Sequence, residues 1–355
     1  MKLLVTGATG HLGANLVRRL LQDGHSIKVL LRPGDDTSGV EGLDVERVEG
    51  DLRDLEAMRR AVKGVERIFH TAAKVSTLEG EEREIYDINV IGTRNLLQAA
   101  REAGVGRVVV TSSFSAVGHR EDGPSDETDS FYPYEKHMPY ERSKAWAEHE
   151  VLKAVAEGQD VVIAISCALL GPNDFIPSRM GRVVMDFAKG KMKAYIPGGF
   201  EFVATRDIVQ GHLLAMEKGR TGQRYIFSTR FVEVDELVSI LERVTGMPKP
   251  PMRLPPPVMA AVAEVSQVIL SNFFPKVPQR FTPGAVRILR MQRRADTSKA
   301  RNELGYQPSS IEDALREAYE HFIERGLLPG HTARPKPSST NKTSSSTAPA
   351  QEARP

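Results

Sequence analysis

A glycine-rich turn near the N-terminus constrains the fold more than any other feature of the sequence. Residues 2–32, KLLVTGATGHLGANLVRRLLQDGHSIKVLLR, carry the pattern of a strand, three glycines at Gly7, Gly10 and Gly13, an amphipathic helix and a second strand. Glycine lets the chain turn sharply, lets the backbone approach a pyrophosphate and lets the helix pack closely on the sheet. The free N–H groups of the first helical turn can then bind the phosphates. In this order of elements, the glycine spacing predicts a dinucleotide-binding site.

Apolar, β-branched runs alternate with helical patterns through the first half of the chain. The runs lie at 2–6, 26–31, 47–49, 67–70, 107–113 and 161–166. Strands separated by amphipathic helices predict an α/β fold, a doubly wound parallel (Rossmann) sheet with helices on both faces.

After Leu170, prolines and glycines interrupt this alternation of strand and helix patterns. We expect residues 1–170 to form an NAD(P)-binding Rossmann domain, to which 200–230 returns through the apolar run RYIFS (224–228). Residues 171–199 and 231–329 would form a smaller, discontinuous, mostly helical C-terminal substrate domain. Residues 330–355 have almost no large apolar side chain, so we expect a disordered tail there.

The composition predicts a soluble globular protein of the cytoplasm. Lone Cys167 excludes an intramolecular disulfide, and the early glycines do not suit the apolar region of a signal peptide. The net charge of +2 gives no bulk attraction to nucleic acid. The most apolar stretch, 255–275, is interrupted by Glu264, Gln267 and Asn272, so it does not suit a membrane span. We expect a substrate-domain helix there, one that could touch a membrane surface.

The end of the second predicted strand indicates which dinucleotide is bound. Arg32 stands where an acidic residue would bind the ribose of NAD. A guanidinium suits the 2′-phosphate of NADP, which is therefore the predicted cofactor. NAD stays the alternative, because Asp35 or Asp36 could accept a ribose hydroxyl while Arg32 stacks on adenine.

The pattern Tyr-x-x-x-Lys occurs twice in residues 132–144, as Tyr132 with Lys136 and as Tyr140 with Lys144. A carbonyl reductase can use tyrosine as its proton donor when a nearby cation stabilises the phenolate, because unperturbed tyrosine has a pKa of about 10. On a helix, a lysine four residues later lies one turn away on the same face.

Proline distinguishes the two pairs. Tyr132 is followed by Pro133, which predicts a loop. Tyr140 follows Pro139 and opens a stretch without a helix breaker before Gly158. The candidate catalytic pair is therefore Tyr140 and Lys144. The loop residues that could face the substrate are Tyr134, Lys136 and His137.

A serine-rich strand end supplies a third candidate group. The run 107–113 ends in Thr111, Ser112 and Ser113, at the carboxyl edge where doubly wound sheets bind ligands. Alternation along a strand places Ser112 and Ser113 on opposite faces, so we expect one of them to point into the cleft.

Six motifs occur in the order typical of one family: GATGHLG (7–13), GDLRD (50–54), HTAA (70–73), NVIGTRNLLQAA (89–100), TSSFSAVG (111–118) and PYERSKAWAE (139–148). From its first residue to about residue 328, the chain resembles the extended short-chain dehydrogenase/reductase family, also called the NAD-dependent epimerase/dehydratase family. The resemblance implies that Ser113 is the catalytic serine, that Tyr140 is the acid/base and that Lys144 binds the nicotinamide ribose. The cofactor-binding residues that it implies, together with Arg32 from the strand end, are Gly7, Thr9, Gly10, His11, Leu12, Gly13, Arg32, Asp51, Leu52, Ala72, Ala73, Tyr140 and Lys144.

Two later segments, 200–228 and 296–308, narrow the resemblance. They are similar to hopanoid-associated sugar epimerases, dihydroflavonol reductases and hydroxysteroid dehydrogenases, which differ in chemistry. Relatives commonly have Arg-Pro where this chain has Ser166-Cys167, at the nicotinamide end of the implied pocket.

The segment around the candidate serine indicates which reaction is catalysed. Family dehydratases place an Asp-Glu pair after a threonine at the serine site, whereas TSSFSA (111–116) has no carboxylate. We therefore predict an NAD(P)H-dependent oxidoreductase that reduces a ketone, or oxidises the alcohol, of a bulky and lipophilic substrate related to secondary metabolites or lipids. The alternatives are a nucleotide-sugar epimerase with tightly bound NAD and a non-catalytic dinucleotide-binding regulatory protein, a class that usually lacks the Tyr/Lys pair.

The predicted partner is a small molecule, with no nucleic acid and no metal. The resemblance also implies a homodimer, because the family often pairs through two helices of each subunit, including the one that carries Tyr140.

Overall fold

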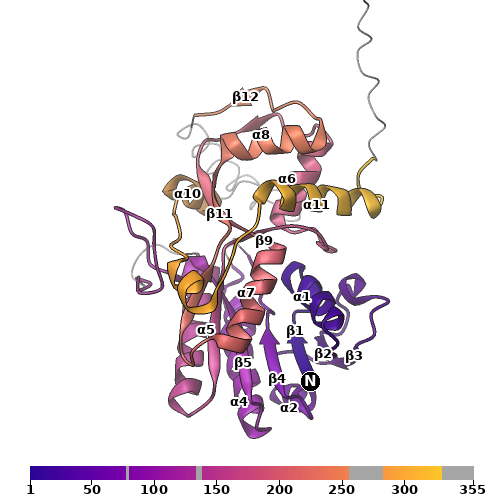
Figure 1. Ribbon diagram of the computed structural model, residues 1–355, viewed down its shortest axis with the longest axis vertical. Helices are drawn as coiled ribbons and strands as arrows, with labels where there is room; N and C mark the ends of the chain where they lie inside the picture. Colours follow the sequence, from indigo (N-terminus) through magenta and orange to yellow (C-terminus); the bar gives the residue numbers. More distant parts are fainter. Residues whose placement is uncertain (77–79, 133–137, 256–282, 330–355) are drawn as a thin grey trace, which may run out of the picture.

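The computed structural model describes residues 1–76, 80–132, 138–255 and 283–329. Its centre is a seven-stranded sheet in the order β10-β6-β5-β4-β1-β2-β3, in which all neighbours are parallel (Figure 1). The strands are β1 (Lys2–Thr6), β2 (Ser26–Leu31), β3 (Glu46–Glu49), β4 (Arg67–His70), β5 (Arg107–Ser113), β6 (Val161–Ser166) and β10 (Arg224–Phe227). The predicted doubly wound parallel sheet is confirmed.

Helices cover both faces of this sheet. On one face α1 packs beside α7, and on the other α4 packs between α2 and α5 (Figure 1). The helices are α1 (His11–Gln22), α2 (Leu55–Val62), α3 (Glu82–Tyr86), α4 (Gly92–Glu102), α5 (Pro139–Ala156) and α7 (Thr205–Lys218), with short turns η1 (Ser38–Val40), η2 (Asp87–Ile91), η3 (Phe114–Ala116) and η4 (Ala300–Leu304).

The central strands form where the sequence is continuously apolar. All six residues of β6, VVIAIS, are buried, and so are the last four of β1. Strands of a parallel sheet are covered on both faces, so they need apolar side chains in both directions rather than in alternation. This is why the runs in the first half of the sequence predict the strands well.

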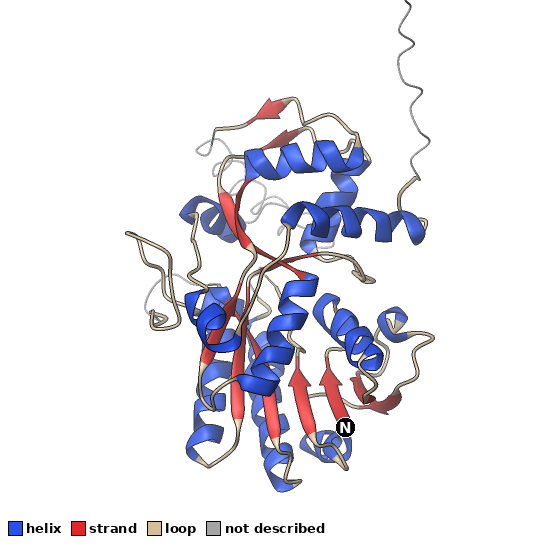
Figure 2. Cartoon of the chain, in the orientation of Figure 1, coloured by secondary structure: helices blue, strands red, loops and turns tan. Residues whose placement is uncertain are grey.

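A second group of elements lies beyond the carboxyl ends of the central strands, at the top of Figure 2. It has a three-stranded sheet in the order β11-β9-β7 and a small parallel pair, β12-β8. Its elements are β7 (Ala168–Leu170), β8 (Ala194–Tyr195), β9 (Gly199–Ala204), β11 (Arg230–Glu233), β12 (Met252–Arg253), α6 (Arg179–Ala188), α8 (Val234–Thr245), α10 (Pro283–Met291) and α11 (Ile311–Glu324). The buried side chains of this group, such as Phe187, Phe202 and Phe322, form an apolar cluster separate from that of the central sheet.

Segment 200–230 therefore divides between the two sheets. Residues 224–227 form β10 beside β6, whereas β9 pairs with β7 and β11. The domain boundaries expected from the sequence stay predictions. The disordered tail expected at 330–355 lies outside the described residues, and so does the helix expected in 255–275, apart from its first residue. None of the described helices combines the length and the hydropathy that a membrane span requires.

Candidate active site

The turn between β1 and α1 shows why glycine is needed there. Gly7 has a φ of +73°, in the left-handed region that favours glycine. A Cβ atom on Gly7 would lie 2.6 Å from the Cα atom of Ala72, in the segment after β4. A Cβ atom on Gly13 would overlap the carbonyl oxygen of Gly7. The turn is thus packed between α1 and the end of β4, where the strand order changes direction and where such sheets bind ligands.

A pocket of about 380 Å³ opens beside this turn. It lies at the carboxyl ends of β1, β2 and β4. Eight of the predicted cofactor-binding residues line it: Gly7, Thr9, Gly10, Arg32, Asp51, Leu52, Ala72 and Ala73. The glycine cradle, the free N–H groups at the start of α1 and the mixed apolar and charged walls suit a dinucleotide. Sequence reasoning missed other lining residues, including Thr71, Lys74 and Ile88.

Arg32 and Asp35 share one wall of this pocket. Arg32 donates from Nε and Nη2 to Oδ1 of Asp35, at 3.0 and 2.8 Å, and both residues line the pocket. Asp36 instead accepts a hydrogen bond from the backbone N–H of Ser38, at 2.8 Å. A phosphate on Arg32 and a hydroxyl on Asp35 therefore both stay open as binding modes. Nearby, hydrogen bonds from Arg53 lower the pKa of Asp51.

His11 and Leu12 do not line the pocket. Nε2 of His11 lies 3.1 Å from the carbonyl oxygens of both Gly171 and Pro172, and burial lowers the pKa of this histidine. Leu12 is buried in the apolar core. Contacts of these residues with a dinucleotide would thus come from their backbone N–H groups.

Helix α5 carries the candidate tyrosine and lysine. It begins at Pro139, and the backbone N–H of Met138 donates to Oε2 of Glu141, at 2.7 Å, which caps the helix start. It ends before Gly158, which has a φ of +90°. The predicted helix is confirmed, with Tyr140 and Lys144 one turn apart on it.

The Ser113 hydroxyl lies near enough to the Tyr140 phenol to act on its pKa. The Ser115 hydroxyl donates to Oγ of Ser113, at 2.8 Å. Burial raises the pKa of Tyr140, while the Ser113 hydroxyl and the Arg179 guanidinium act in the opposite direction. The phenol is therefore protonated at neutral pH, the state in which it can donate to a carbonyl oxygen.

Lys144 is buried beneath the same strand end. Its Nζ donates to the carbonyl oxygen of Thr111, at 2.6 Å. Burial lowers the pKa of Lys144 to about 8, and Glu148 opposes this shift. At neutral pH the side chain is thus mostly an ammonium ion.

The two serines at the end of β5 have different partners. Ser112 is 3% exposed and donates to Oε1 of Glu148, whereas Ser113 is less buried and lies near the Tyr140 phenol. The alternation of a strand thus leaves Ser113 beside the candidate acid.

The rival pair is not on a described helix. Tyr132 is 57% exposed and lies in a loop. Lys136, with Tyr134 and His137, falls outside the described residues.

A π-helical turn, η2, links the pocket wall to α5, and sequence reasoning assigned it no role. Asn89 in this turn accepts a hydrogen bond from the backbone N–H of Lys74, at 2.7 Å, and donates to Oγ of Ser143, at 2.9 Å. Such turns are often found at functional sites. The asparagine stands inside the motif NVIGTRN, so its position was visible but its contacts were not.

Comparisons with known proteins agree with this geometry. A sequence model of the NAD dependent epimerase/dehydratase family matches residues 3–227. Sterol demethylase protein B of Methylococcus capsulatus is 45% identical, over 92% of this chain and 100% of that protein. A protein of Stigmatella aurantiaca named 4-hydroxy-2-methyl-3-oxo-4-farnesyl-3,4-dihydroquinoline-1-oxide ketoreductase is 28% identical, over 90% of this chain and 96% of its own length.

Among solved structures, the crystal structure of gox2253 superposes with a TM-score of 0.80 and 34% identity, covering 92% of this chain and 99% of that one. The family model matches more than half of the chain, and the fold and the dinucleotide pocket agree with it. The chain is therefore an NAD(P)-dependent oxidoreductase, and it belongs to the NAD dependent epimerase/dehydratase family.

Proposed function

We propose that this protein interconverts a secondary alcohol and a ketone on a bulky, apolar substrate of the sterol or isoprenoid class, with NADP as the preferred cofactor. The observations that support the proposal are that the Ser113 hydroxyl acts on Tyr140 and that Lys144 donates to the Thr111 carbonyl, both at the carboxyl end of β5. They lie near the end of the sheet where the dinucleotide pocket opens.

Each of these side chains has a role in the reduction. Tyr140 protonates the carbonyl oxygen, and the Ser113 hydroxyl binds the same oxygen. Lys144 adds positive charge one helical turn from the phenol, which favours the phenolate that forms. When bound, NAD(P)H supplies the hydride. Because the pKa of Tyr140 is raised, its phenol is ready to donate at neutral pH, whereas oxidation of the alcohol needs the phenolate and is favoured at higher pH.

The names of two relatives support the substrate class, and the absence of a carboxylate near the candidate serine supports the type of reaction. One relative is named for a sterol and another for a farnesyl-bearing ketone. The segment around the catalytic serine, TSSFSA, has no carboxylate that could serve a dehydration.

Exchange of single tyrosines tests the proposal. Tyr140→Phe removes the proton donor, so kcat for reduction of a 3-ketosteroid or farnesylated ketone should fall by about 10²–10⁴-fold. The Kd for NADPH, measured by fluorescence, should stay near the wild-type value. Tyr132→Phe is the matched control, because this exposed tyrosine should be dispensable.

Full activity of Tyr140→Phe together with loss of activity in Tyr132→Phe would refute the assignment. Purified protein that carries bound NAD and converts a nucleotide sugar without added cofactor would favour the epimerase instead. Dinucleotide binding without turnover of any ketone or alcohol would favour a regulatory protein.

A further inference from the structure

A buried carboxylate lies next to the candidate site and has no role in the chemistry above. Glu148 is 7% exposed and accepts a hydrogen bond from the Ser112 hydroxyl. Nε of Arg224 lies 3.4 Å from its other oxygen, Oε2. A buried carboxylate is stable only with such partners, because removal from water disfavours its charge.

Glu148 stands four residues after Lys144 on α5, so the two side chains lie on one face, about 6 Å apart along the axis. Three consecutive residues of β5 interact with α5, two of them through hydrogen bonds to this face. The Thr111 carbonyl accepts from Lys144, Ser112 donates to Glu148, and the Ser113 hydroxyl acts on the pKa of Tyr140 at the helix start. The acid thus belongs to the same set of contacts that holds the candidate lysine.

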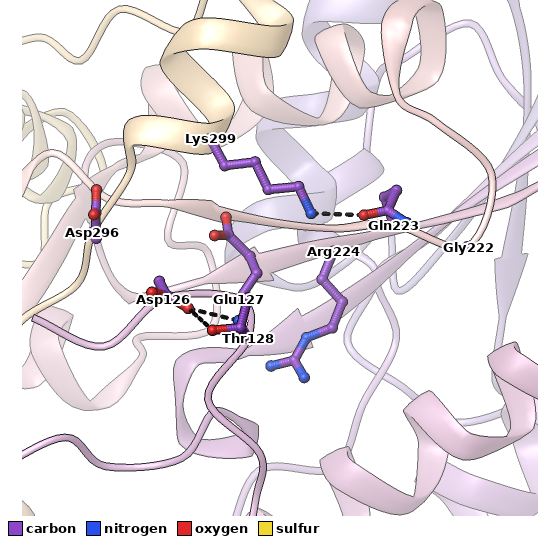
Figure 3. Close-up of a pocket in the computed structure, with 8 residues that line it drawn as sticks. All are labelled: Asp126, Glu127, Thr128, Gly222, Gln223, Arg224, Asp296 and Lys299. Carbon is purple, nitrogen blue, oxygen red and sulfur yellow. Dashed lines mark hydrogen bonds between the residues drawn. The ribbon is translucent and has the colours of Figure 1, made fainter.

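Arg224 reaches Glu148 from the edge of the sheet. It is the first residue of β10, paired in register with Ile163 of β6. It also lines a second pocket, of about 400 Å³, with Glu127 and Lys299 (Figure 3). Figure 3 shows the guanidinium directed away from the Lys299 ammonium.

The other charges of this second pocket have partners of their own. Glu127 accepts from the backbone N–H of Ile226, at 2.7 Å, and Lys299 donates to Oε1 of Gln223, at 2.9 Å. Among the described residues, the recorded ion pair of Arg224 is with Glu148. Nε and Nη2 of the arginine are buried and have no hydrogen-bond acceptor within the described part of the chain, so they act on the carboxylate by charge.

The titratable groups that interact with Lys144 come from two elements, with Glu148 on α5 and His70 on β4, while the Thr111 carbonyl of β5 accepts its hydrogen bond. Burial lowers the pKa of His70 to about 3, so this imidazole is neutral at pH 7. Glu148 is thus the negative charge that acts on the lysine among the described residues. Glu148 itself is faced by Ser112 on β5, Arg224 on β10, and Lys144 and His149 on α5.

We propose that Glu148 is a positioning residue for Lys144: a buried counter-charge that keeps the ammonium ion formed and bound to the Thr111 carbonyl, with Arg224 orienting the carboxylate from the sheet edge. The proposal rests on the proposed function, since Glu148 acts only through Lys144. It gives the edge strand β10 a part in the site, although β10 contributes no residue to the set that meets the substrate.

The test measures the lysine itself in cofactor-free protein. Lysine labelled with ¹³C at Cε is titrated by NMR, and Lys144→Met identifies the resonance. Glu148→Gln keeps the shape and the Ser112 hydrogen bond but removes the charge, so the pKa of Lys144 should fall by about one unit. In turnover assays the alkaline limb of kcat against pH should move to lower pH by a similar amount.

Glu150→Gln is the matched control. Glu150 is an equally buried carboxylate on α5, but it binds Arg94, at 2.9 and 3.0 Å, and Lys153. This variant should leave the pKa of Lys144 unchanged. If Glu148→Gln does not fold, the double variant Glu148→Met/Arg224→Met removes both charges together, and the pKa of Lys144 should still fall, but by less, because the positive charge of Arg224 is lost as well.

An unchanged pKa of Lys144 in Glu148→Gln, or an equal shift in Glu150→Gln, would overturn the proposal. Because the NMR titration needs neither substrate nor cofactor, its result stands apart from the tyrosine exchange. Failure of the proposed function would appear as activity in Tyr140→Phe, whatever the lysine does.

Discussion

At the scale of single residues, Lys144 is a charged group held away from water. Its pKa of about 8 in the folded protein lies below the pKa of a lysine in the unfolded chain. The unfolded chain therefore binds the lysine proton more tightly than the folded protein does. The buried ammonium ion lowers the free energy of unfolding, and the whole of this effect is present below pH 8. The effect fades as the pH rises towards the pKa of the unfolded residue.

Lys144→Met should therefore stabilise the protein while it abolishes activity. The gain in free energy of unfolding should be about 2 kcal/mol at pH 7, after allowance for the lost hydrogen bond to Thr111. Urea unfolding at pH 7 and at pH 10 checks this, and the gain should shrink at the higher pH. A variant less stable than wild type at pH 7 would contradict this account of the lysine.

Arg32 decides the cofactor at the same scale. Arg32→Ala should weaken NADPH binding about tenfold, because a partly exposed guanidinium gives a charged hydrogen bond of modest strength. NADH binding should change little. Fluorescence titration of both dinucleotides measures this, and an equal loss for both would favour Asp35 as the ribose ligand.

The helix that carries Tyr140 and Lys144 was predictable from the sequence because proline has a local effect. Pro133 predicts a loop at the first pair, whose lysine lies outside the described residues, and Pro139 starts the helix at the second. The role proposed for Glu148 was not predictable. Its spacing from Lys144 was visible, but its contacts with Ser112 and Arg224 join three elements that only the folded chain brings together.

At the scale of elements, the central strands were predictable and the outer ones were not. Strands such as β6 are buried on both faces, so their sequences are apolar throughout. Strands β7 and β11 are short and only partly buried, and β9 pairs with both of them. Their sequences carry no comparable signal, since cross-strand pairing at a distance decides them.

At the scale of the whole molecule, the candidate active site lies at the carboxyl ends of the strands of the seven-stranded sheet. The apolar cluster of this sheet is on one side of it, and the second apolar cluster is on the other. The central cluster holds the dinucleotide pocket, and the second forms the elements beyond it. A homodimer through α5 stays a prediction. This helix exposes Trp146 and Leu152, by 39% and 50%.

The central claim is that hydride is transferred between NAD(P) and the substrate carbon while Tyr140 donates a proton to the substrate oxygen or accepts one from it. Mass analysis of the alcohol formed from a sterol ketone with NADPH that carries deuterium at both C4 positions tests this most directly. The account predicts one deuterium on the carbinol carbon with the wild-type protein and almost no product with Tyr140→Phe. Product without deuterium, or the same labelled product from Tyr140→Phe, would contradict it.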